Sequence, residues 1–371
     1  MLEQSLLNQL ESIVGTDNLF TDITNLDIFS SDALSPNRAY SLQELLTTLP
    51  SAVICPSSAA QISKIVKLCN KHKIPLTAVG GGTGVMGGIT PSRGSLIISL
   101  IYMNDITNFD PVSQSVTAQA GLLLGELSKY LNSKNYILGH DPYSLNIATV
   151  GGAISTNGVG YTASKYGTMG EQVISLEVVL PSGDILPISY APTSSVGPDV
   201  SKLFIGSEGT LGIITSATIK IFPKPAMVQF LTIGFLDFEI GYKFLLRIWN
   251  CGSKPSLIDL TEENTTTTMH LMFDGEPEIV ISSIHWVKTQ LDGINQYLVN
   301  LDWTVSYWNK RHSTADSYAL TALRQQRSVK WARNSSNLFE YLHVSLPPSK
   351  VLSYKEQSQS IVKDYDLSVT E

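Results

Sequence analysis

The chain has 371 residues, of which 43% are hydrophobic and 15% are charged, and its formal net charge is −7 at pH 7. This composition fits a well-filled globular protein of two domains and excludes extended disorder. It also argues against a nucleic-acid partner, which would need a dense Lys/Arg face, because the basic residues here are only thinly scattered.

The three cysteines are Cys55, Cys69 and Cys251. They are odd in number and widely spaced, and they form neither a CxxC pair nor a zinc pattern, so we predict no metal site and a reducing compartment. The first fifteen residues read as an amphipathic helix without the basic region and long apolar stretch of a signal peptide. No apolar run is long enough to span a bilayer. We therefore expect a cytoplasmic protein without a transmembrane segment.

The first glycine-rich loop lies between two predicted strands. Strands are predicted over 53–55, 76–79 and 95–100, with a helix over 59–71 that follows a turn with an N-cap. The glycines begin directly after the second strand. Nicotinamide-binding Rossmann sites and P-loops need a helix after such a loop, and no Gly-Lys-Ser/Thr is present. Any anion must therefore be held by loop N–H groups.

The remaining elements divide the chain at the prolines Pro223 and Pro225. Before them we predict strands over 115–120, 174–180, 185–187 and 211–221 and a helix over 123–131. After them we predict strands over 230–235, 269–273 and 338–346, alternating with helices over 239–250, 278–291 and 350–365. This alternation predicts a second α/β domain with helices laid on a sheet.

Four segments concentrate glycine together with small hydroxyl residues. The first, 80–88, has six glycines among nine residues. The others are 140–152, 153–167 and 206–214. Because glycine lets a backbone approach a ligand and Ser and Thr add hydrogen bonds without bulk, the four segments suit a long, polar, diphosphate-bearing ligand.

In order and spacing, these four segments resemble the flavin-binding domain of the vanillyl-alcohol-oxidase (PCMH-type) family of FAD-binding oxidoreductases. The resemblance is strong over 50–225 and fainter beyond. The nearest branch includes the glycolate oxidase large subunit, D-lactate dehydrogenases and alkyl-dihydroxyacetone-phosphate synthase. It implies an α+β fold with an N-terminal helix and polar segment (1–50), a two-subdomain PCMH-type FAD-binding domain (51–225) and a second α/β, ferredoxin-like cap domain (226–371) that is C-terminally incomplete.

The resemblance also implies which residues hold FAD. The first loop would wrap the pyrophosphate, the second and third segments would line the cofactor and contact the flavin, and the fourth would hold the adenosine side and the ring. No His or Cys lies in the first loop, so we expect noncovalent FAD. The implied FAD-binding residues are Val79, Gly80, Gly81, Gly82, Thr83, Gly84, Tyr143, Ser144, Thr149, Gly151, Gly152, Thr156, Asn157, Gly158, Glu208, Gly209, Thr210, Gly212 and Ile213.

Oxidation of a 2-hydroxy acid needs a cation for the carboxylate, a base for the hydroxyl proton and a flavin N5 near the C–H bond. Candidate cations lie in the runs 324–327 and 331–333, and we single out Arg327 and Arg333. The candidate base is His343, on a run that resembles the cap strand facing the flavin. For any single arginine, a solvent-exposed helix charge is the simpler interpretation. For His343, a pocket role and a core role suit the pattern about evenly.

The chain stops where the resemblance predicts a further glycine-rich, His-containing motif, and it lacks the histidine run of the synthase. The leading interpretation is an FAD-dependent oxidation of glycolate or D-lactate by hydride transfer to N5, with an unidentified electron acceptor. One alternative is a synthase of the alkyl-dihydroxyacetone-phosphate kind. Another is a catalytically silent FAD-binding subunit. Both a homo-oligomer and membership of a complex remain open.

Overall fold

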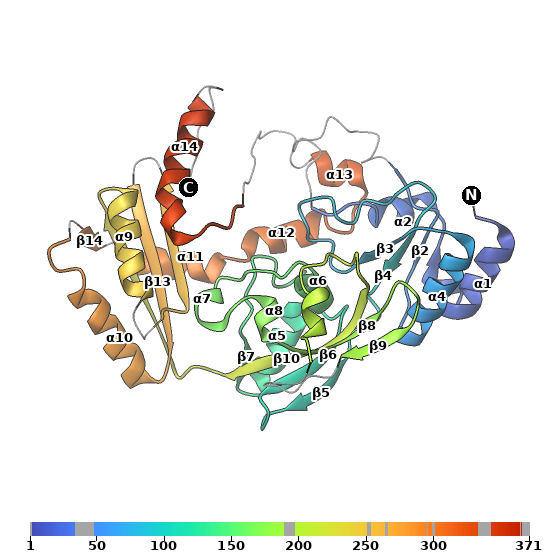
Figure 1. Ribbon diagram of the computed structural model, residues 1–371, viewed down its shortest axis with the longest axis horizontal. Coiled ribbons are helices and arrows are strands. Elements are labelled where there is room, and N and C mark those ends of the chain that lie inside the picture. Colours follow the sequence, from blue (N-terminus) through green and yellow to red (C-terminus); the bar gives the residue numbers. More distant parts are fainter. Residues whose placement is uncertain are drawn as a thin grey trace. The chain divides into compact units, whose positions relative to one another are not determined.

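A computed structural model describes residues 2–33, 48–188, 197–250, 254–263, 266–294, 296–298, 301–332, 343–363 and 365 (Figure 1). The chain forms two compact units. The first comprises Met1–Gly160, Tyr166–Lys224 and Arg311–Phe339, and the second comprises Tyr161–Lys165, Pro225–Lys310 and Glu340–Glu371. The functions predicted for the domains remain predictions. The compact units differ from the predicted domains in two internal segments, since Arg311–Phe339 packs with the first unit and Tyr161–Lys165 with the second.

The first unit begins with a small sheet in the order β1-β2-β4-β3. Strands β2 (Ala52–Ile54), β4 (Leu96–Ser99) and β3 (Leu76–Val79) are parallel, and β1 (Leu19–Phe20) adds to β2 in the antiparallel sense. Helices α1 (Gln4–Val14), α2 (Ile23–Ile28) and α4 (Ala59–His72) belong to the same region. Helix α4 begins where Ser58 accepts a hydrogen bond from the Gln61 N–H group, and its apolar side is buried. The predicted strand-loop-strand order around the glycine loop is confirmed.

The second sheet of this unit has six strands in the order β5-β6-β10-β8-β9, and β7 also pairs with β10. All of these pairs are antiparallel. One hydrophobic core joins the two sheets, because residues such as Ile54, Ile98, Val116 and Ile219 belong to one cluster. The elements are β5 (Ile106–Asp110), β6 (Ser115–Gln119), α5 (Leu124–Ser133), β7 (Tyr136–Leu138), α6 (Val150–Ser155), α7 (Ala163–Tyr166), α8 (Met169–Gln172), β8 (Val173–Val179), β9 (Ile185–Ile188) and β10 (Ile213–Pro223).

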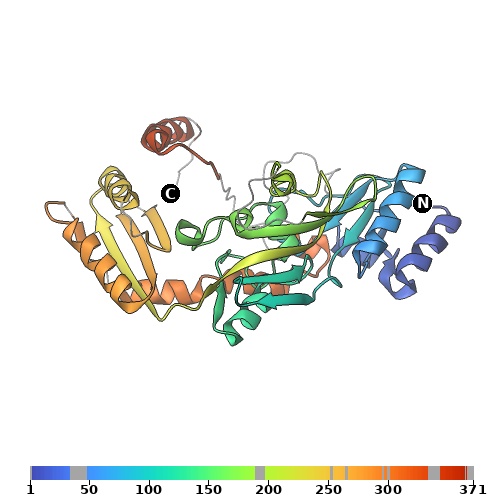
Figure 2. The same ribbon diagram turned by 60° about the horizontal axis from the view of Figure 1, so that its bottom comes forward.

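The second unit runs β11 (Met227–Phe235), α9 (Phe238–Trp249), β12 (Leu257–Glu263), β13 (Thr266–Gly275), α10 (Pro277–Thr289) and β14 (Gln296–Leu298). Its antiparallel sheet has the order β12-β13-β11-β14. This βαββαβ arrangement is the ferredoxin-like fold, as predicted. The strands and helices are seen from a second direction in Figure 2.

Alternating residues of these strands face opposite sides of the sheet. Leu231 and Ile233 of β11 lie in a cluster with Phe244 of α9 and Val280 of α10. The intervening Thr232 hydrogen-bonds instead to Thr304 of α11 (Leu301–Lys310). Helices therefore lie against both faces of the sheet, because side chains alternate along a strand.

Helices α12 (Ser313–Thr321) and α13 (Arg327–Ala332) belong to the first unit, and neither was predicted. The predicted helix 350–365 corresponds to α14 (Val351–Lys363). The strand predicted over 338–346 was wrong for residues 343–346, which form no strand, while residues 338–342 lie outside the described residues. The alternating pattern there runs into Pro347 and Pro348, which lack the N–H group that a ladder needs.

Candidate cofactor site

The glycine loop that follows β3 packs closely on the second glycine-rich segment. A Cβ atom added to Gly80 would lie 2.3 Å from the Thr149 hydroxyl oxygen. A Cβ atom added to Gly81 would lie 2.2 Å from the carbonyl oxygen of Ile147. These two glycines are therefore required by contact between two parts of the protein, before any ligand is considered.

Gly82 differs from its neighbours because it faces open space. Its φ angle is +65°, which L side chains rarely adopt, and the nearest atom to an added Cβ would be Leu323 Cδ1 at 4.0 Å. Residues 79–82 line a cavity of about 640 Å³ in the first unit. Gly82 is thus a position where the bare backbone meets a space large enough for a ligand.

The four predicted segments converge. The Thr149 hydroxyl accepts a hydrogen bond from the Gly152 N–H group at 3.2 Å and so caps α6, which lies within the second and third segments. From the fourth segment, the Gly206 N–H group donates to the carbonyl oxygen of Ile154 at 3.1 Å. A Cβ atom on Gly88, in the first segment, would lie 3.1 Å from Glu208 Oε2. Segments that are distant in the sequence therefore form one site.

Two non-glycine residues of this site have left-handed backbones. Asn157 has φ 47° and Glu208 has φ 52°. The Asn157 side chain accepts a hydrogen bond from the Gly170 N–H group at 3.0 Å, and the Glu208 N–H group donates to the carbonyl oxygen of Ser155 at 2.8 Å. Such backbone strain persists only where the surroundings hold it, and it often marks functional sites.

The cavity is lined by five of the predicted cofactor residues, namely Val79, Gly80, Gly81, Gly82 and Thr149. The other predicted residues lie in the converging segments but outside this lining, and their roles stay predictions. They are Thr83, Gly84, Tyr143, Ser144, Gly151, Gly152, Thr156, Asn157, Gly158, Glu208, Gly209, Thr210, Gly212 and Ile213.

The segment from the end of α12 to the start of α13 contributes a wall that the sequence predicted only in part, because Arg324 belongs to the run 324–327 of candidate cations but was not singled out. Leu320, Leu323, Arg324 and Gln325 line the cavity beside the glycine loop. The Arg324 side chain is exposed, and it makes no hydrogen bond or ion pair with any part of the chain that the structure describes. The apolar walls are Phe20, Phe29, Ile89 and Ile101. A cavity with apolar walls and bare loop backbone suits a long ligand with a flat ring and a diphosphate, and the Arg324 guanidinium adds a positive charge at its wall.

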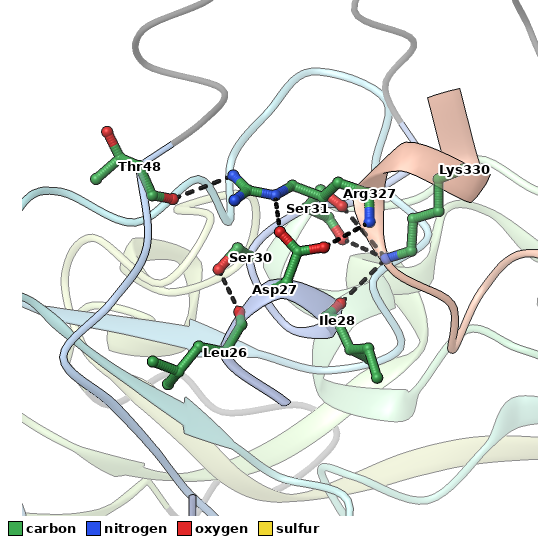
Figure 3. Close-up of polar contacts among 8 residues, drawn as sticks. All are labelled: Leu26, Asp27, Ile28, Ser30, Ser31, Thr48, Arg327 and Lys330. Carbon is green, nitrogen blue, oxygen red and sulfur yellow. Dashed lines mark hydrogen bonds and ion pairs between the residues drawn. The ribbon is translucent and has the colours of Figure 1, made fainter. Parts of the chain in front are cut away.

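Arg327, a predicted catalytic residue, is engaged elsewhere. Its side chain is buried, Nε lies 2.6 Å from Asp27 Oδ1, and its backbone N–H group donates to Asp27 Oδ2 at 2.8 Å (Figure 3). Nη1 donates to the carbonyl oxygen of Thr48 at 3.2 Å. The described contacts of Arg327 give it a structural function, and its catalytic role stays a prediction.

The two other predicted catalytic residues cannot be placed at the cavity. Arg333 lies outside the described residues. His343 is exposed and belongs to the second unit, ahead of α14. Their catalytic roles remain predictions.

A buried ionic cluster lies at the start of the second segment. Asp141 Oδ2 is 2.7 Å from Arg311 Nε, and Asp141 Oδ1 is 2.9 Å from His312 Nε2. Burial acts to raise the pKa of Asp141, but the hydrogen bonds from His312 and Arg311 outweigh it, so the pKa is lowered. Neither partner was foreseen, because 170 residues separate Arg311 from Asp141.

His140 is buried beside this cluster, with 1% of its surface exposed. Burial lowers its pKa to about 4, although the neighbouring Asp141 carboxylate acts in the opposite direction. At neutral pH the imidazole is therefore uncharged. Its Nδ1 atom has no hydrogen-bond partner among the described residues.

The buried cysteines do not suit covalent attachment of a cofactor. Burial raises the pKa of Cys55 to about 11 and that of Cys69 to about 12, so both thiols stay protonated at neutral pH. In the described part of the chain, no group of three His, Cys, Asp or Glu side chains could hold a metal ion. Among the helices described above, none combines the length and apolar character needed to cross a bilayer.

Comparison with known families shows which cofactor this part of the chain binds. Residues 50–189 match the model of the FAD binding domain. The chain carries an FAD-binding domain of the PCMH type. The match covers β2 to β9, which includes the first three glycine segments. The predicted family and the predicted cofactor, FAD, are thereby confirmed.

Individual proteins with this domain are similar over part of their length. The chain is 34% identical over 226 residues to glycolate oxidase subunit GlcD of Bacillus subtilis (strain 168), which covers 61% of this chain and 46% of that protein. It is 39% identical over 192 residues to D-lactate dehydrogenase of Anaerostipes hadrus, which covers 51% of this chain and 40% of that protein. The chain thus spans less than half the length of these two relatives.

Among solved structures, the fold is similar to that of alkyldihydroxyacetonephosphate synthase. The TM-score is 0.73 at 22% sequence identity, with 88% of this chain and 65% of that chain covered. This likeness confirms the predicted α+β fold.

Proposed function

We propose that the chain is the FAD-binding part of an oxidoreductase that oxidises a small D-2-hydroxy acid such as glycolate or D-lactate. The similarity to the glycolate oxidase subunit and to D-lactate dehydrogenase supports this substrate class. One observation in the structure carries the proposal. Arg324, with no ionic partner among the described residues, lies on the wall of the cavity that the glycine loop lines.

The residues of the cavity fit FAD. The loop that contains Gly80, Gly81 and Gly82 would hold the pyrophosphate through its backbone N–H groups, since these can approach an anion without side chains in between. The Thr149 hydroxyl lies beside Gly80, where it can hydrogen-bond the cofactor. Bound FAD would supply a hydride acceptor. We propose that it is held noncovalently.

Arg324 would hold the substrate carboxylate. A guanidinium group binds a carboxylate through two parallel hydrogen bonds, and that geometry orients the hydroxyl-bearing carbon. Arg327 is poorly suited to this function because its guanidinium already pairs with Asp27. His343 stays our predicted base for the hydroxyl proton, and a His343→Gln variant tests that role separately from FAD binding.

The experiment is anaerobic reduction of the flavin in the purified protein. We expect a yellow protein whose flavin absorbance is bleached by glycolate or D-lactate and not by L-lactate. Arg324→Gln should raise the substrate concentration needed for half-maximal bleaching by about tenfold to a hundredfold, as loss of a charged hydrogen bond predicts. Arg93→Gln, at an exposed position outside the cavity lining, is the matched control.

Three outcomes separate this proposal from its alternatives. A colourless protein that takes up no added FAD would overturn it altogether. Bound FAD that no D-2-hydroxy acid bleaches would indicate a synthase-like enzyme or a silent subunit. Flavin that stays with the polypeptide after acid precipitation would contradict noncovalent binding.

A further inference from the structure

A short N-terminal segment lies between helix α13 and the glycine loop. We call residues 27–33, which are the last two residues of α2 and the five that follow them, the N-terminal hook. Ile28, Phe29 and Ser31 of the hook line the same cavity as Gly80 to Gly82. The hook is thus a neighbour of both the FAD site and the distant segment that contains α13.

Helix α13 holds the hook through two buried cations. Arg327 binds the Asp27 carboxylate with both its side chain and its backbone N–H group, at 2.6 and 2.8 Å. The Lys330 ammonium donates to the carbonyl oxygens of Ile28 at 3.1 Å and Ser31 at 3.0 Å (Figure 3). Since both cations are buried, their contacts are shielded from solvent and fix the hook against the helix.

The end of the hook, at Asp32 and Ala33, holds the glycine loop. Asp32 is 3% exposed, and its Oδ2 atom accepts a hydrogen bond from the Gly87 N–H group at 2.9 Å. The Ala33 N–H group donates to the carbonyl oxygen of Gly84 at 2.8 Å. A Cβ atom on Gly84 would lie 3.2 Å from Asp32 Oδ2, so loop and carboxylate are tightly packed. Two points of the loop are therefore tied to the hook.

The Lys330 ammonium on α13 interacts electrostatically with two carboxylates of the hook. Burial lowers the pKa of Lys330 to about 8, and the carboxylates of Asp32 and Asp27 act in the opposite direction. The ammonium has three acceptors, because Ser31 Oγ lies at 3.3 Å in addition to the two carbonyl oxygens. A cation with three acceptors has no donor left for a ligand, although Lys330 borders the cavity. Its function is to position other groups.

The loop needs such support because of its composition. Six glycines in 80–88 give the unfolded and open states of the loop a large conformational entropy. Val85 and Met86 are exposed and add little packing. The hydrogen bonds from the hook are thus a substantial part of what orders the loop.

We propose that Arg327, Lys330, Asp27 and Asp32 form a positioning relay, in which α13 holds the hook and the hook holds the glycine loop in the shape that binds FAD. The inference rests on the proposed function of that loop. Its consequence is that a contact between two residues 300 positions apart in the sequence, neither of them in the glycine loop, controls cofactor affinity.

The test measures the loop directly, with and without FAD. Hydrogen–deuterium exchange of peptides covering 80–90 is compared between the wild-type chain, Arg327→Gln and Asp32→Asn, all without added FAD. We expect faster exchange in both variants. In FAD titrations, Kd should rise by roughly five- to 150-fold, the range of ordinary coupling free energies. Arg327→Lys, which keeps the charge, should restore part of the affinity.

Matched controls exclude a general loss of stability. Lys67→Gln removes one partner of the exposed Lys67–Asp184 pair in the same unit, and it should change neither readout. Asp27→Asn combined with Arg327→Gln should cost little more FAD affinity than either change alone, because both break one contact. If Arg327→Gln does not fold, Asp32→Asn and Arg327→Lys give the same readouts with smaller changes.

The inference is overturned if loop exchange in the variants matches that of the wild-type chain, whether or not FAD binds. It is also overturned if FAD affinity falls only in proportion to the general loss of stability. Failure of the wild-type chain to bind FAD would sink the proposed function instead. In that case the exchange comparison still decides whether the relay exists.

Discussion

Gly81 and Ile147 are in direct backbone contact, since a Cβ atom built on Gly81 would lie 2.2 Å from the Ile147 carbonyl oxygen. The glycine-rich loop therefore carries two requirements. Gly80 and Gly81 let the loop pack on the second glycine segment, while Gly82 presents a left-handed backbone to open space in the cavity. Substitutions at Gly81 and Gly82 should separate protein packing from cofactor binding.

We expect Gly81→Val to lose both FAD binding and stability. The new side chain would clash with backbone, which cannot give way as a side-chain end can, so the free energy of unfolding should fall by about 3 kcal/mol or more. Gly82→Ala should lose only about 1–2 kcal/mol, the cost of a left-handed backbone without glycine, yet weaken FAD binding through the methyl group facing the cavity. Urea unfolding and FAD titration measure the two effects. Equal losses of stability in the two variants would contradict this division.

The arginines Arg324 and Arg327 should differ in what they change. Arg327→Gln leaves the half-buried Asp27 carboxylate without its charged partner, which should cost roughly 1.5–3 kcal/mol of stability. Arg324→Gln removes an exposed side chain and should alter stability by less than about 0.5 kcal/mol. Thermal unfolding of both variants beside the wild-type chain checks this, and a large loss for Arg324→Gln would show that its guanidinium is structural.

Local patterns in the sequence predicted much of the fold. The strand over Leu76–Val79 and the helix that begins at Ala59 form where hydrophobic spacing and an N-cap serine indicate them. Such signals involve neighbours along the chain and are visible without tertiary structure. The strand that was wrongly predicted over 343–346 also lies in a run of alternating polar and apolar residues. The sequence of a single run does not show whether a partner strand exists to pair with it.

The site was predictable only in part, for a related reason. Glycine density pointed to the loop that lines the cavity. Glycine loses more conformational entropy on folding than other residues, so a cluster of glycines indicates a place where the backbone geometry requires them. The cavity wall at Leu323 and Arg324, and the pairing of Asp27 with Arg327, depend on contacts across about 300 residues. One sequence does not show which of its charged residues meet in the folded protein.

Thr149 should matter through its hydroxyl group. It caps α6 by accepting the Gly152 N–H hydrogen bond, and it also borders the cavity next to Gly80. Thr149→Val keeps the shape and removes the cap, so we expect a loss of about 1 kcal/mol and weaker FAD binding. Thr149→Ser keeps the hydroxyl and should retain FAD affinity. Weak binding in the serine variant as well would assign the effect to the methyl group.

His140 should make stability fall in mildly acidic solution. Its pKa is about 4 in the folded protein and 6.5 in the unfolded chain, so the unfolded chain binds more protons between these values. The contribution of uncharged His140 to the free energy of unfolding is therefore fully present above about pH 6.5 and is lost as the pH falls towards 4. The difference between the two pKa values corresponds to roughly 3 kcal/mol.

His140→Gln isolates this contribution because glutamine stays neutral throughout. The buried His270 of the second unit also has a pKa of about 4, and Asp141 has a lowered pKa, but both are present in the variant and cancel in the difference. We expect the stability difference between wild-type and variant to change across pH 4–6.5, the wild-type chain losing more. The exposed His72, changed to Gln, is the control. If the difference for His140→Gln stays flat over this range, the imidazole is charged in the folded protein, and a group beyond the described contacts must stabilise it.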